Sequence, residues 1–413
     1  MSTTQERWSP PAERRLALAA GLVALAVFGF AWALLHRGFY ARDQIVDTPV
    51  YQRYGDAMLD GKVPFRDFRV EYPPVALPVF LLPAIGDGHD ERTYRRNFER
   101  LMVLCGLLAI AGVAIALTAL QAEPDRLFAA LGFAALAPLA LGSVILTRFD
   151  LWPTALLVLG LAAVLAERRR TGLGVLGLGA AAKIFPVVVV PPALVYVWRR
   201  HGRREALICG GLFVGVLALC FLPFVILSPG GVWDSLLRQA DRPLQIESLG
   251  SSFLLVAHQL GVWTVHLNLS HGSQNQGGSL ANALAAIQSV LQAVVVIALW
   301  IAFARGPAAP ERLVRYSAAC VAAFIAFGKV LSPQFLIWLI PLVPLVRGRR
   351  GLAASAVLAA ALVLTQLWFP YRYWDLALRQ DAFASWLVLA RDLVLVALVA
   401  VLAIPRREPA RMT

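Results

Sequence analysis

The sequence predicts an all-α membrane protein that crosses the bilayer many times. Of its 413 residues, 59% are hydrophobic and only 15% are charged, and the mean hydropathy is +0.67. Several windows contain the run of about 20 apolar residues that a helix needs to cross a bilayer. Because a soluble domain has no use for so much apolar surface, the composition excludes a soluble globular protein.

The net charge of +13 lies in short stretches between the apolar segments. Lysine occurs only at Lys62, Lys183 and Lys329, so 35 of the 38 basic residues are arginine. The arginine-rich stretches are ERRR at 167–170, RRHGRR at 199–204, RGRR at 347–350 and RR at 406–407. This distribution follows the positive-inside rule and argues against a nucleic-acid-binding protein. We therefore expect these stretches, and both ends of the chain, to lie in the cytoplasm.

Twelve apolar segments follow one another along the chain. They lie at 16–35, 99–120, 126–146, 150–166, 172–182, 184–198, 206–227, 281–304, 313–328, 331–346, 351–369 and 386–404. The first is long and is followed by no small-residue cleavage site, which favours a retained signal anchor over a signal peptide. The pattern predicts a single integral membrane domain over 1–413, with about 10–12 transmembrane helices.

One pair of segments is unusual because its first member is too short to cross the bilayer. The 11 residues at 172–182 rise only about 16 Å as a helix. We interpret 172–182 and 184–198 as a broken or re-entrant hairpin with Lys183 near its outer tip. Such irregular backbone is tolerated at membrane depth only where protein or a water-filled cavity surrounds it.

If the N-terminus is cytoplasmic and successive apolar segments cross the membrane in alternating directions, five polar stretches lie on the outer face. They are the first outer loop at 36–98, the turn at 147–150, a second long outer loop at 228–280, the turn at 328–334 and the stretch at 370–385. The inner loops contain little besides arginine. All the candidate chemistry is therefore expected to face away from the cytoplasm.

Short elements are expected inside the outer loops. Helical spacing at 49–59 predicts a short helix. The apolar stretch at 75–85 is too short to cross the bilayer and is expected to lie in the membrane interface, as is a helix at 231–240. The polar, Gly/Ser-rich run at 268–280 predicts a mobile loop.

The first outer loop is rich in carboxylates. Its acids include Asp43, Asp47, Asp56, Asp60, Asp67, Glu71 and Asp90. Asp43 and Asp47 lie just beyond the first span, where a carboxylate can act as a general base towards a sugar hydroxyl. The competing interpretation makes Asp47 or Thr48 a helix N-cap and makes Asp43 a solvated loop acid.

The stretch RDFRVEYPP at 66–74 places further charges beside aromatic residues. For Arg66 and Asp67 we expect an ion pair that holds the loop down. A tyrosine before two prolines is forced into an extended backbone. This restriction holds Glu71 and Tyr72 in place above the membrane.

Two lysines interrupt apolar sequence. Lys183 lies within GLGAAAKIFPVVVVPP, where an ionisable residue is costly and marks a candidate functional site. A lysine at a glycine-rich break suits a phosphate partner, and the alternative is a snorkelling interfacial lysine. Lys329, in FGKVLSPQFLIWLIP, has the same character, with Ser332 and Gln334 as added hydrogen-bond donors.

Two more charged stretches belong to the predicted outer face. Arg148 and Asp150 form a charged turn in TRFDLWP, in which a structural ion pair is the simpler role for Arg148. RPLQIESLGSS at 242–252 is a polar patch between apolar flanks, which suits either sugar binding or a loop anchor. Its candidate members are Arg242, Gln245, Glu247 and Ser248.

The sequence gives no indication of a metal or nucleotide site. Of the histidines at 36, 89, 201, 258, 266 and 271, only His201 has an acid four residues away, Glu205 beside an arginine-rich stretch, and no two histidines lie four residues apart. There is no P-loop, dinucleotide fingerprint or nucleophile elbow. We therefore expect chemistry without a metal or a cofactor.

Six motifs, taken in order, resemble those of the bacterial glycosyltransferase family 87 of the GT-C superfamily. They are DTPVY at 47–51, GKVPFRDFRVEYPP at 61–74, TRFD at 147–150, AAAKIFP at 180–186, RPLQIES at 242–248 and GKVLSPQFLIW at 328–338. The family includes polyprenol-phosphate-mannose-dependent α-mannosyltransferases. The resemblance implies a GT-C-like helical bundle in a bacterial plasma membrane, with an extracytoplasmic site.

The resemblance also implies roles for individual residues. It implies an inverting, metal-independent transfer of a hexose, with mannose as the expected sugar, from a polyprenyl phosphate to a glycolipid or cell-envelope glycan. Asp47 is the implied catalytic base, with Asp43 as the alternative. Lys183, Lys329 and Arg148 are expected to bind the donor phosphate. The expected sugar and acceptor residues are Tyr51, Glu71, Tyr72, Asp150, Arg242, Gln245, Glu247, Ser248 and Gln334.

Two other classes of function compete with this one. A transporter or flippase of lipid-linked sugars would place charges near mid-membrane and on both faces and would show repeat symmetry. No clear internal repeat is present. A structural subunit without catalysis would not need the two lysines in apolar sequence.

Overall fold

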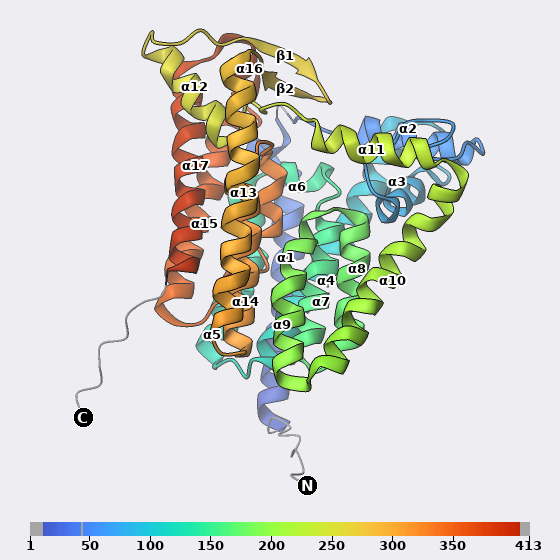
Figure 1. Cartoon of the computed structure of the whole chain (residues 1–413), viewed down its shortest axis with the longest axis vertical. Coiled ribbons are helices and arrows are strands. Elements are labelled where there is room, and N and C mark those ends of the chain that lie inside the picture. The colour runs from blue at the N-terminus through green and yellow to red at the C-terminus, as the bar shows by residue number, and fades with distance from the viewer. Residues whose placement is uncertain (1–10, 43, 405–413) are drawn as a thin grey trace.

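The computed structural model describes residues 11–42 and 44–404, and this part of the chain is almost entirely helical (Figure 1). Among the described residues, seven helices are long and apolar enough to cross a membrane. They are α1 (Pro11–Leu34), α4 (Glu91–Ala119), α5 (Pro124–Leu141), α10 (Arg203–Leu227), α13 (Ser279–Arg305), α15 (Gly348–Trp368) and α17 (Ala382–Ala403). The predicted all-α polytopic membrane fold is confirmed.

The other five predicted segments fold as shorter helices within the same bundle. They form α7 (Leu151–Leu165), α8 (Arg169–Ala182), the 3-10 helix η3 (Phe185–Val189) with α9 (Val190–His201), α14 (Pro310–Ala326), and the 3-10 helices η4 (Pro333–Trp338) and η5 (Val343–Leu345). Prolines at the start of η3, η4 and η5 fit their irregularity, since proline lacks the N–H that continues an α-helix.

The predicted break around Lys183 is confirmed. Helix α8 ends at Ala182, and Lys183 itself has an extended backbone (φ −159°, ψ 141°) before η3 begins. Helices α7 and α8 form an antiparallel hairpin of 15 and 14 residues, so the chain returns to the level at which α7 began. Their approach is close, because a Cβ on Gly172 would lie 2.7 Å from the Gly160 carbonyl oxygen. The hairpin therefore brings Lys183 back beside Asp150.

Short elements gather at one end of the bundle, which we call the site end, and α1 begins and α17 ends at the other end (Figure 1). These elements are η1 (Gly38–Ala41), α2 (Thr48–Leu59), η2 (Pro74–Ala76), α3 (Leu77–Ala84), α6 (Val144–Thr147), α11 (Pro229–Ala240), α12 (Leu249–Gln259), the strands β1 (Leu267–Ser270) and β2 (Ser273–Gln276), and α16 (Tyr373–Arg379). The short helices predicted at 49–59 and 231–240 correspond to α2 and α11.

Helix α3 is apolar, and its buried side chains pack against the rest of the protein. Its Leu77, Val79 and Phe80 side chains are buried. Tyr51 of α2 stacks on the Phe80 ring at a centroid distance of 4.5 Å. Gly55 allows this approach, since a Cβ there would lie 2.6 Å from the Phe80 carbonyl oxygen. Helix α3 thus fixes the position of α2.

The mobile loop predicted at 268–280 is wrong, because β1 and β2 form an antiparallel hairpin there. The hairpin is anchored to the polar patch that precedes α12: Gln276 N–H donates to the Leu244 carbonyl at 2.8 Å, and Ile246 N–H donates to the Gln274 carbonyl at 3.0 Å. Asn275 is fully buried and its amide donates to the Ser270 carbonyl at 2.8 Å. These bonds order a stretch whose composition alone suggested mobility.

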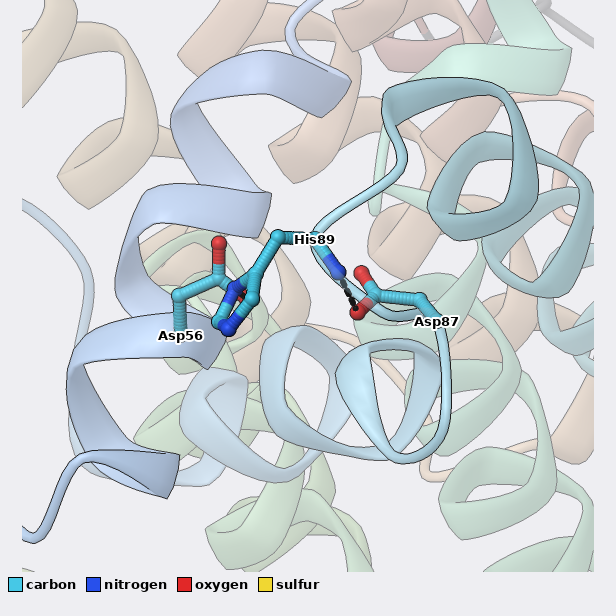
Figure 2. A group of neighbouring side chains, drawn as sticks. All are labelled: Asp56, Asp87 and His89. Carbon is cyan, nitrogen blue, oxygen red and sulfur yellow. Dashed lines mark hydrogen bonds and ion pairs between the residues drawn. The ribbon is translucent and has the colours of Figure 1, made fainter.

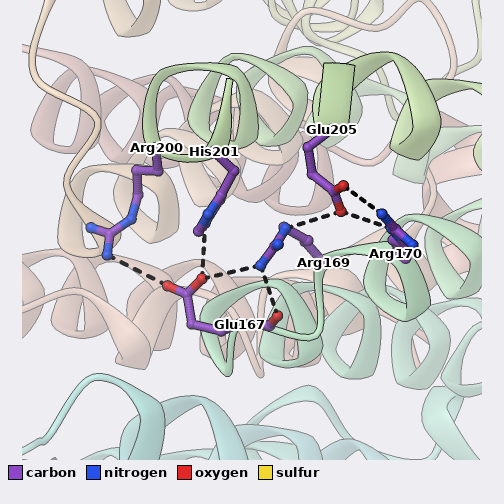
Figure 3. A network of polar contacts seen from close by, with 6 residues as sticks. All are labelled: Glu167, Arg169, Arg170, Arg200, His201 and Glu205. Atoms are coloured by element: carbon purple, nitrogen blue, oxygen red, sulfur yellow. Dashed lines mark hydrogen bonds and ion pairs between the residues drawn. The ribbon is translucent and has the colours of Figure 1, made fainter. Parts of the chain in front are cut away.

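The end opposite the site carries the arginine-rich turns between α7 and α8 and between α9 and α10. Figure 3 shows Glu167 among Arg169, Arg200 and His201, at 3.8, 3.4 and 2.9 Å. Glu205 pairs with Arg169 at 3.0 Å and with Arg170 at 2.8 Å. Two carboxylates thus link the arginines of successive turns.

Candidate active site

The first component of the site is the carboxylate of Asp47 at the start of α2. Asp47 occupies the predicted N-cap position, but its carboxylate caps none of the described backbone N–H groups of the helix. It instead forms an ion pair with Arg148, and the Tyr51 hydroxyl donates to its Oδ2 at 3.4 Å. The Asp47 side chain is 31% exposed. An accessible carboxylate that is not used as a cap is available for chemistry.

Arg148 links Asp47 to the rest of the site. It lies in the turn between α6 and α7, is buried, and donates through Nη2 to the Ile45 carbonyl at 3.3 Å. The ion pair predicted for Arg148 exists, and its partner is Asp47. Asp150 and Glu247 also lie within electrostatic range of its guanidinium. Arg148 is therefore a buried cation shared by three carboxylates.

The second component is the buried pair of Asp150 and Lys183. Lys183 Nζ lies 2.7 Å from Asp150 Oδ1, and the Trp338 indole N–H donates to the same oxygen at 2.7 Å. The Asp150 side chain is 1% exposed and that of Lys183 is 17% exposed. Burying both charges is costly unless each is paired and hydrogen-bonded. The indole and the lysine together satisfy this requirement for Asp150.

Aromatic rings surround the Lys183 ammonium. Its Nζ lies 4.7, 5.1 and 5.2 Å from the ring centroids of Phe149, Phe335 and Trp338. Electron-rich ring faces attract a cation at such distances. Trp338 is itself held by stacking on Phe185 at 3.9 Å. The lysine is thus fixed in a partly apolar box beside Asp150.

The third component is an aromatic wall formed by Tyr51 and Tyr72. The Tyr72 ring packs edge-on against Phe149 at 4.9 Å and Tyr51 at 5.9 Å. Burial raises the pKa of Tyr72 above its usual range, so the hydroxyl stays protonated and can donate a hydrogen bond. Gln239 of α11 donates to the Glu71 carbonyl at 3.0 Å, which fixes the extended backbone beside Tyr72.

The fourth component is the polar patch before α12. Gln245 Nε2 donates to Glu247 Oε2 at 3.0 Å and to Ser332 Oγ at 2.8 Å. Ser248 Oγ donates to the Gln245 carbonyl at 2.8 Å, which tightens the turn that leads into α12. Burial raises the pKa of Glu247 to about 7, and Arg391 and Arg148 oppose that rise. Glu247 is therefore a carboxyl group that can change its charge near neutral pH.

These four components meet at the site end. Arg242 donates to Ser273 Oγ at 3.0 Å and lies within electrostatic range of Tyr72, Glu71 and Glu247. The charges of Arg148 and Arg242 also act on Lys183. The structure thus joins predicted residues that are up to about 200 positions apart in sequence. The residues brought together are Asp47, Tyr51, Glu71, Tyr72, Arg148, Asp150, Lys183, Arg242, Gln245, Glu247 and Ser248.

Three other predicted residues lie differently. Lys329 is half-buried, and its ammonium donates to the Ala240 carbonyl at the end of α11 at 2.7 Å. Burial lowers the pKa of Lys329, which also lies within electrostatic range of Arg242. Gln334 is half-buried in η4, two residues after Ser332. Asp43 lies outside the described residues.

Several residues of the site were missed by the sequence reasoning. Phe149, Phe335 and Trp338 surround Lys183, and each lies inside a motif that was already singled out. Arg391 and Asp392 form a charged pair within the last apolar helix. Ionisable residues inside a membrane span are candidates by default, and this signal could have found them.

A separate group of possible metal ligands lies on α2 and in the loop before α4. Figure 2 shows Asp56 facing His89 and Asp87, and their ligand atoms all lie within 4.8 Å of one another. Asp87 already accepts hydrogen bonds from the His89 backbone N–H at 2.8 Å and from Gln52 at 3.0 Å. Asp56 lies nine residues after Asp47, which places it on the opposite face of the helix. The metal independence of the chemistry stays a prediction.

Comparison with known proteins gives one family match. The family model of glycosyltransferase family 87 matches residues 71–333, which is more than half of the chain. The chain therefore belongs to glycosyltransferase family 87. No curated protein matches the sequence. The matched range contains Arg148, Asp150, Lys183 and the polar patch before α12, whereas Asp47 precedes it.

Proposed function

We propose that this member of glycosyltransferase family 87 transfers a hexose, specifically mannose, from a polyprenyl-phosphate donor to a glycolipid or cell-envelope glycan. The reaction takes place on the extracytoplasmic face of a bacterial plasma membrane and inverts the anomeric centre. The observation that carries the proposal is the position of the Asp47 carboxylate. It does not cap its helix, and it lies beside the buried cation Arg148 at the site end of an apolar bundle.

In the proposed reaction, Asp47 takes the proton of the acceptor hydroxyl. The hydroxyl oxygen forms a bond to the anomeric carbon, and the bond between that carbon and the phosphate oxygen breaks. The electron pair leaves with the polyprenyl phosphate, which gains negative charge in the transition state. Prepositioned cations stabilise such charge and lower the barrier. All the reacting groups of this proposal are side chains and substrates, so it needs no metal or cofactor.

We assign the phosphate to Lys183, Arg148 and Lys329. Lys183 and Arg148 are held by Asp150 and Asp47 within the buried part of the site. An ammonium group has three N–H donors. Lys329 can therefore keep its bond to the Ala240 carbonyl and still donate to a phosphate oxygen.

We assign the sugar and acceptor to the aromatic and polar walls. Tyr51 and Tyr72 offer rings and hydroxyls, and Glu71, Asp150, Arg242, Gln245, Glu247, Ser248 and Gln334 offer polar groups. Sugars present both apolar C–H faces and hydroxyls, so a site with aromatic rings next to amide and carboxylate groups suits them. In the described structure, Tyr72 and Arg242 lie within electrostatic range of each other.

The proposal is tested with Asp47→Asn in purified protein supplied with labelled polyprenyl-phosphate mannose and an acceptor extract. Loss of a general base typically costs about 100-fold or more in rate, so we expect transfer to fall by at least that factor. The matched control is Asp60→Asn, which makes the same chemical change at an exposed acid paired with Lys62 at 3.6 Å. Full transfer by Asp47→Asn would overturn the assignment of the base.

The same assay separates a transferase from a flippase. A transferase releases free polyprenyl phosphate in step with sugar transfer, whereas a flippase moves the intact lipid and releases none. Release by the wild type and none by Asp47→Asn is the result that we expect. Movement of the intact lipid without release would favour the flippase.

A further inference from the structure

A charged pair lies inside the last long helix. Arg391 and Asp392 of α17 are both 0% exposed, and Arg391 Nε lies 2.7 Å from Asp392 Oδ1. Arg391 follows the first residue of the helix by nine positions, which is about 14 Å along its axis. Ionised side chains inside a membrane span are costly to insert and mark candidate functional sites. The proposed reaction has so far used neither residue.

The pair holds the segment that carries Glu247. Arg391 Nη2 donates to the Glu247 carbonyl at 2.8 Å. Asp392 lies within electrostatic range of the Glu247 carboxylate. The Arg391 guanidinium also packs on the Trp368 ring of α15 at 5.7 Å. Arg391 therefore fixes the residue before the N-cap of α12.

We propose that Arg391 is a positioning residue for sugar transfer, which acts by holding Glu247 at the wall of the sugar site. This inference rests on the proposed function. Arg391 binds the backbone of Glu247 and leaves its carboxylate free to face Gln245, Ser332 and the sugar. It lies outside the matched family range of 71–333.

The second effect of Arg391 is electrostatic. The charged and titratable groups that face Glu247 are Arg148 before α7, Arg391 and Asp392 of α17, Tyr373 of α16, and Arg242 on its own segment. Burial raises the pKa of Glu247 to about 7, and Arg391 is the strongest of the groups that oppose the rise. Removing the Arg391 charge must therefore raise that pKa further. An ionised Glu247 accepts hydrogen bonds from sugar hydroxyls, whereas the protonated form also donates one.

The test compares kcat and KM for labelled polyprenyl-phosphate mannose across pH 5.5–9. We expect the wild type to lose activity below about pH 7, as Glu247 becomes protonated. This fall in activity on the acidic side of the pH profile is called the acidic limb. In Arg391→Gln the acidic limb should move to higher pH, and kcat/KM at pH 7 should fall on the order of tenfold. Arg391→Lys keeps the charge and should keep the limb near its wild-type position. Glu247→Gln should abolish the limb.

A second variant guards against misfolding. Arg391→Gln leaves Asp392 buried without its partner, which is strongly destabilising. The double variant Arg391→Gln, Asp392→Asn removes both charges, so it should fold, and its KM should still be raised because the bond to the Glu247 carbonyl is lost. Asp392 raises the pKa of Glu247, so its removal partly offsets the removal of Arg391, and activity should fall at a pH between those of the wild type and Arg391→Gln. Folding is checked by size-exclusion chromatography in detergent.

The outcomes separate the two proposals. A wild-type KM in the folded double variant would overturn the positioning role of Arg391 and leave the transferase proposal standing. A wild type that transfers no sugar from this donor would overturn the proposed function, and the inference would fall with it.

Discussion

Ion pairs occur at both ends of the bundle, but the pairs of the candidate site are largely buried, whereas the pairs of Glu167 at the opposite end are largely exposed. The side chains of Lys183 and Asp150 are 17% and 1% exposed, compared with 41% and 47% for Arg200 and Glu167. The free-energy cost of desolvating a buried ion pair is offset only when further hydrogen bonds stabilise both charges. An exposed pair has a small desolvation cost and contributes little to stability. The buried pairs of the candidate site therefore need a functional explanation more than the exposed pairs at the opposite end do.

The surroundings of the two sets support this difference. At the site end, one indole N–H and three aromatic rings are placed around a single lysine and its carboxylate. At the opposite end, two carboxylates are shared among Arg169, Arg170, Arg200 and His201 without such a box (Figure 3). Positive-inside orientation is enough to explain the arginines there. The comparison predicts that substitutions affect transfer at one end only.

The largest effect is expected for Lys183→Ala. It removes a proposed phosphate cation and should reduce transfer by about 100-fold or more. It also leaves Asp150 buried without its ion-pair partner, which typically costs about 3–5 kcal/mol of stability. Transfer and thermal unfolding of the purified protein measure the two effects separately.

A double variant separates chemistry from stability at this pair. Lys183→Met with Asp150→Asn removes both charges and keeps similar volumes, so most of the stability should return. Transfer should not return, because the phosphate cation is still missing. Recovery of transfer in the double variant would show that the pair is structural, as the opposite-end pairs are.

A smaller effect is expected for Trp338→Phe. The substitution removes the indole N–H that donates to Asp150 at 2.7 Å, while an aromatic ring remains to stack between Phe185 and Phe335. A hydrogen bond to a charged group is worth about 1.5–3 kcal/mol. We expect transfer to fall about tenfold, with a smaller change in the unfolding temperature. An unchanged kcat would mean that the orientation of Asp150 does not limit the reaction.

The sequence predicted the membrane fold and most of the residues that the structure brings together in the candidate site, because both signals are local. The length of each apolar segment predicts whether it can cross the membrane. Lys183 stands out because it is a charged residue at a glycine-rich break in apolar sequence. The partners could not be predicted. Lys183 contacts Asp150 only because α7 and α8 have nearly equal lengths. The Asp47 carboxylate pairs with Arg148, 101 residues later in the chain, and does not cap its helix.

Two features were not predicted from the sequence, for related reasons. The strands β1 and β2 lack apolar alternation, and their order depends on pairing with Leu244 and Ile246, which lie before α12. The Arg391–Asp392 pair lies in a segment whose average hydropathy hides two charges. Averaging over a window identifies a span and conceals the charged residues within it.

The smallest effect is expected at the opposite end, for Glu167→Gln, whose side chain is 47% exposed. The substitution weakens the pairs with Arg200 at 3.4 Å and His201 at 2.9 Å. Exposed pairs contribute about 0–1 kcal/mol, so the unfolding temperature should fall by about 2 °C or less. Transfer should stay at the wild-type rate. Because salt screens exposed charges, the difference from the wild type should shrink further in about 0.5 M KCl. A loss of transfer comparable to that of Lys183→Ala would contradict the division between a catalytic end and an orienting end.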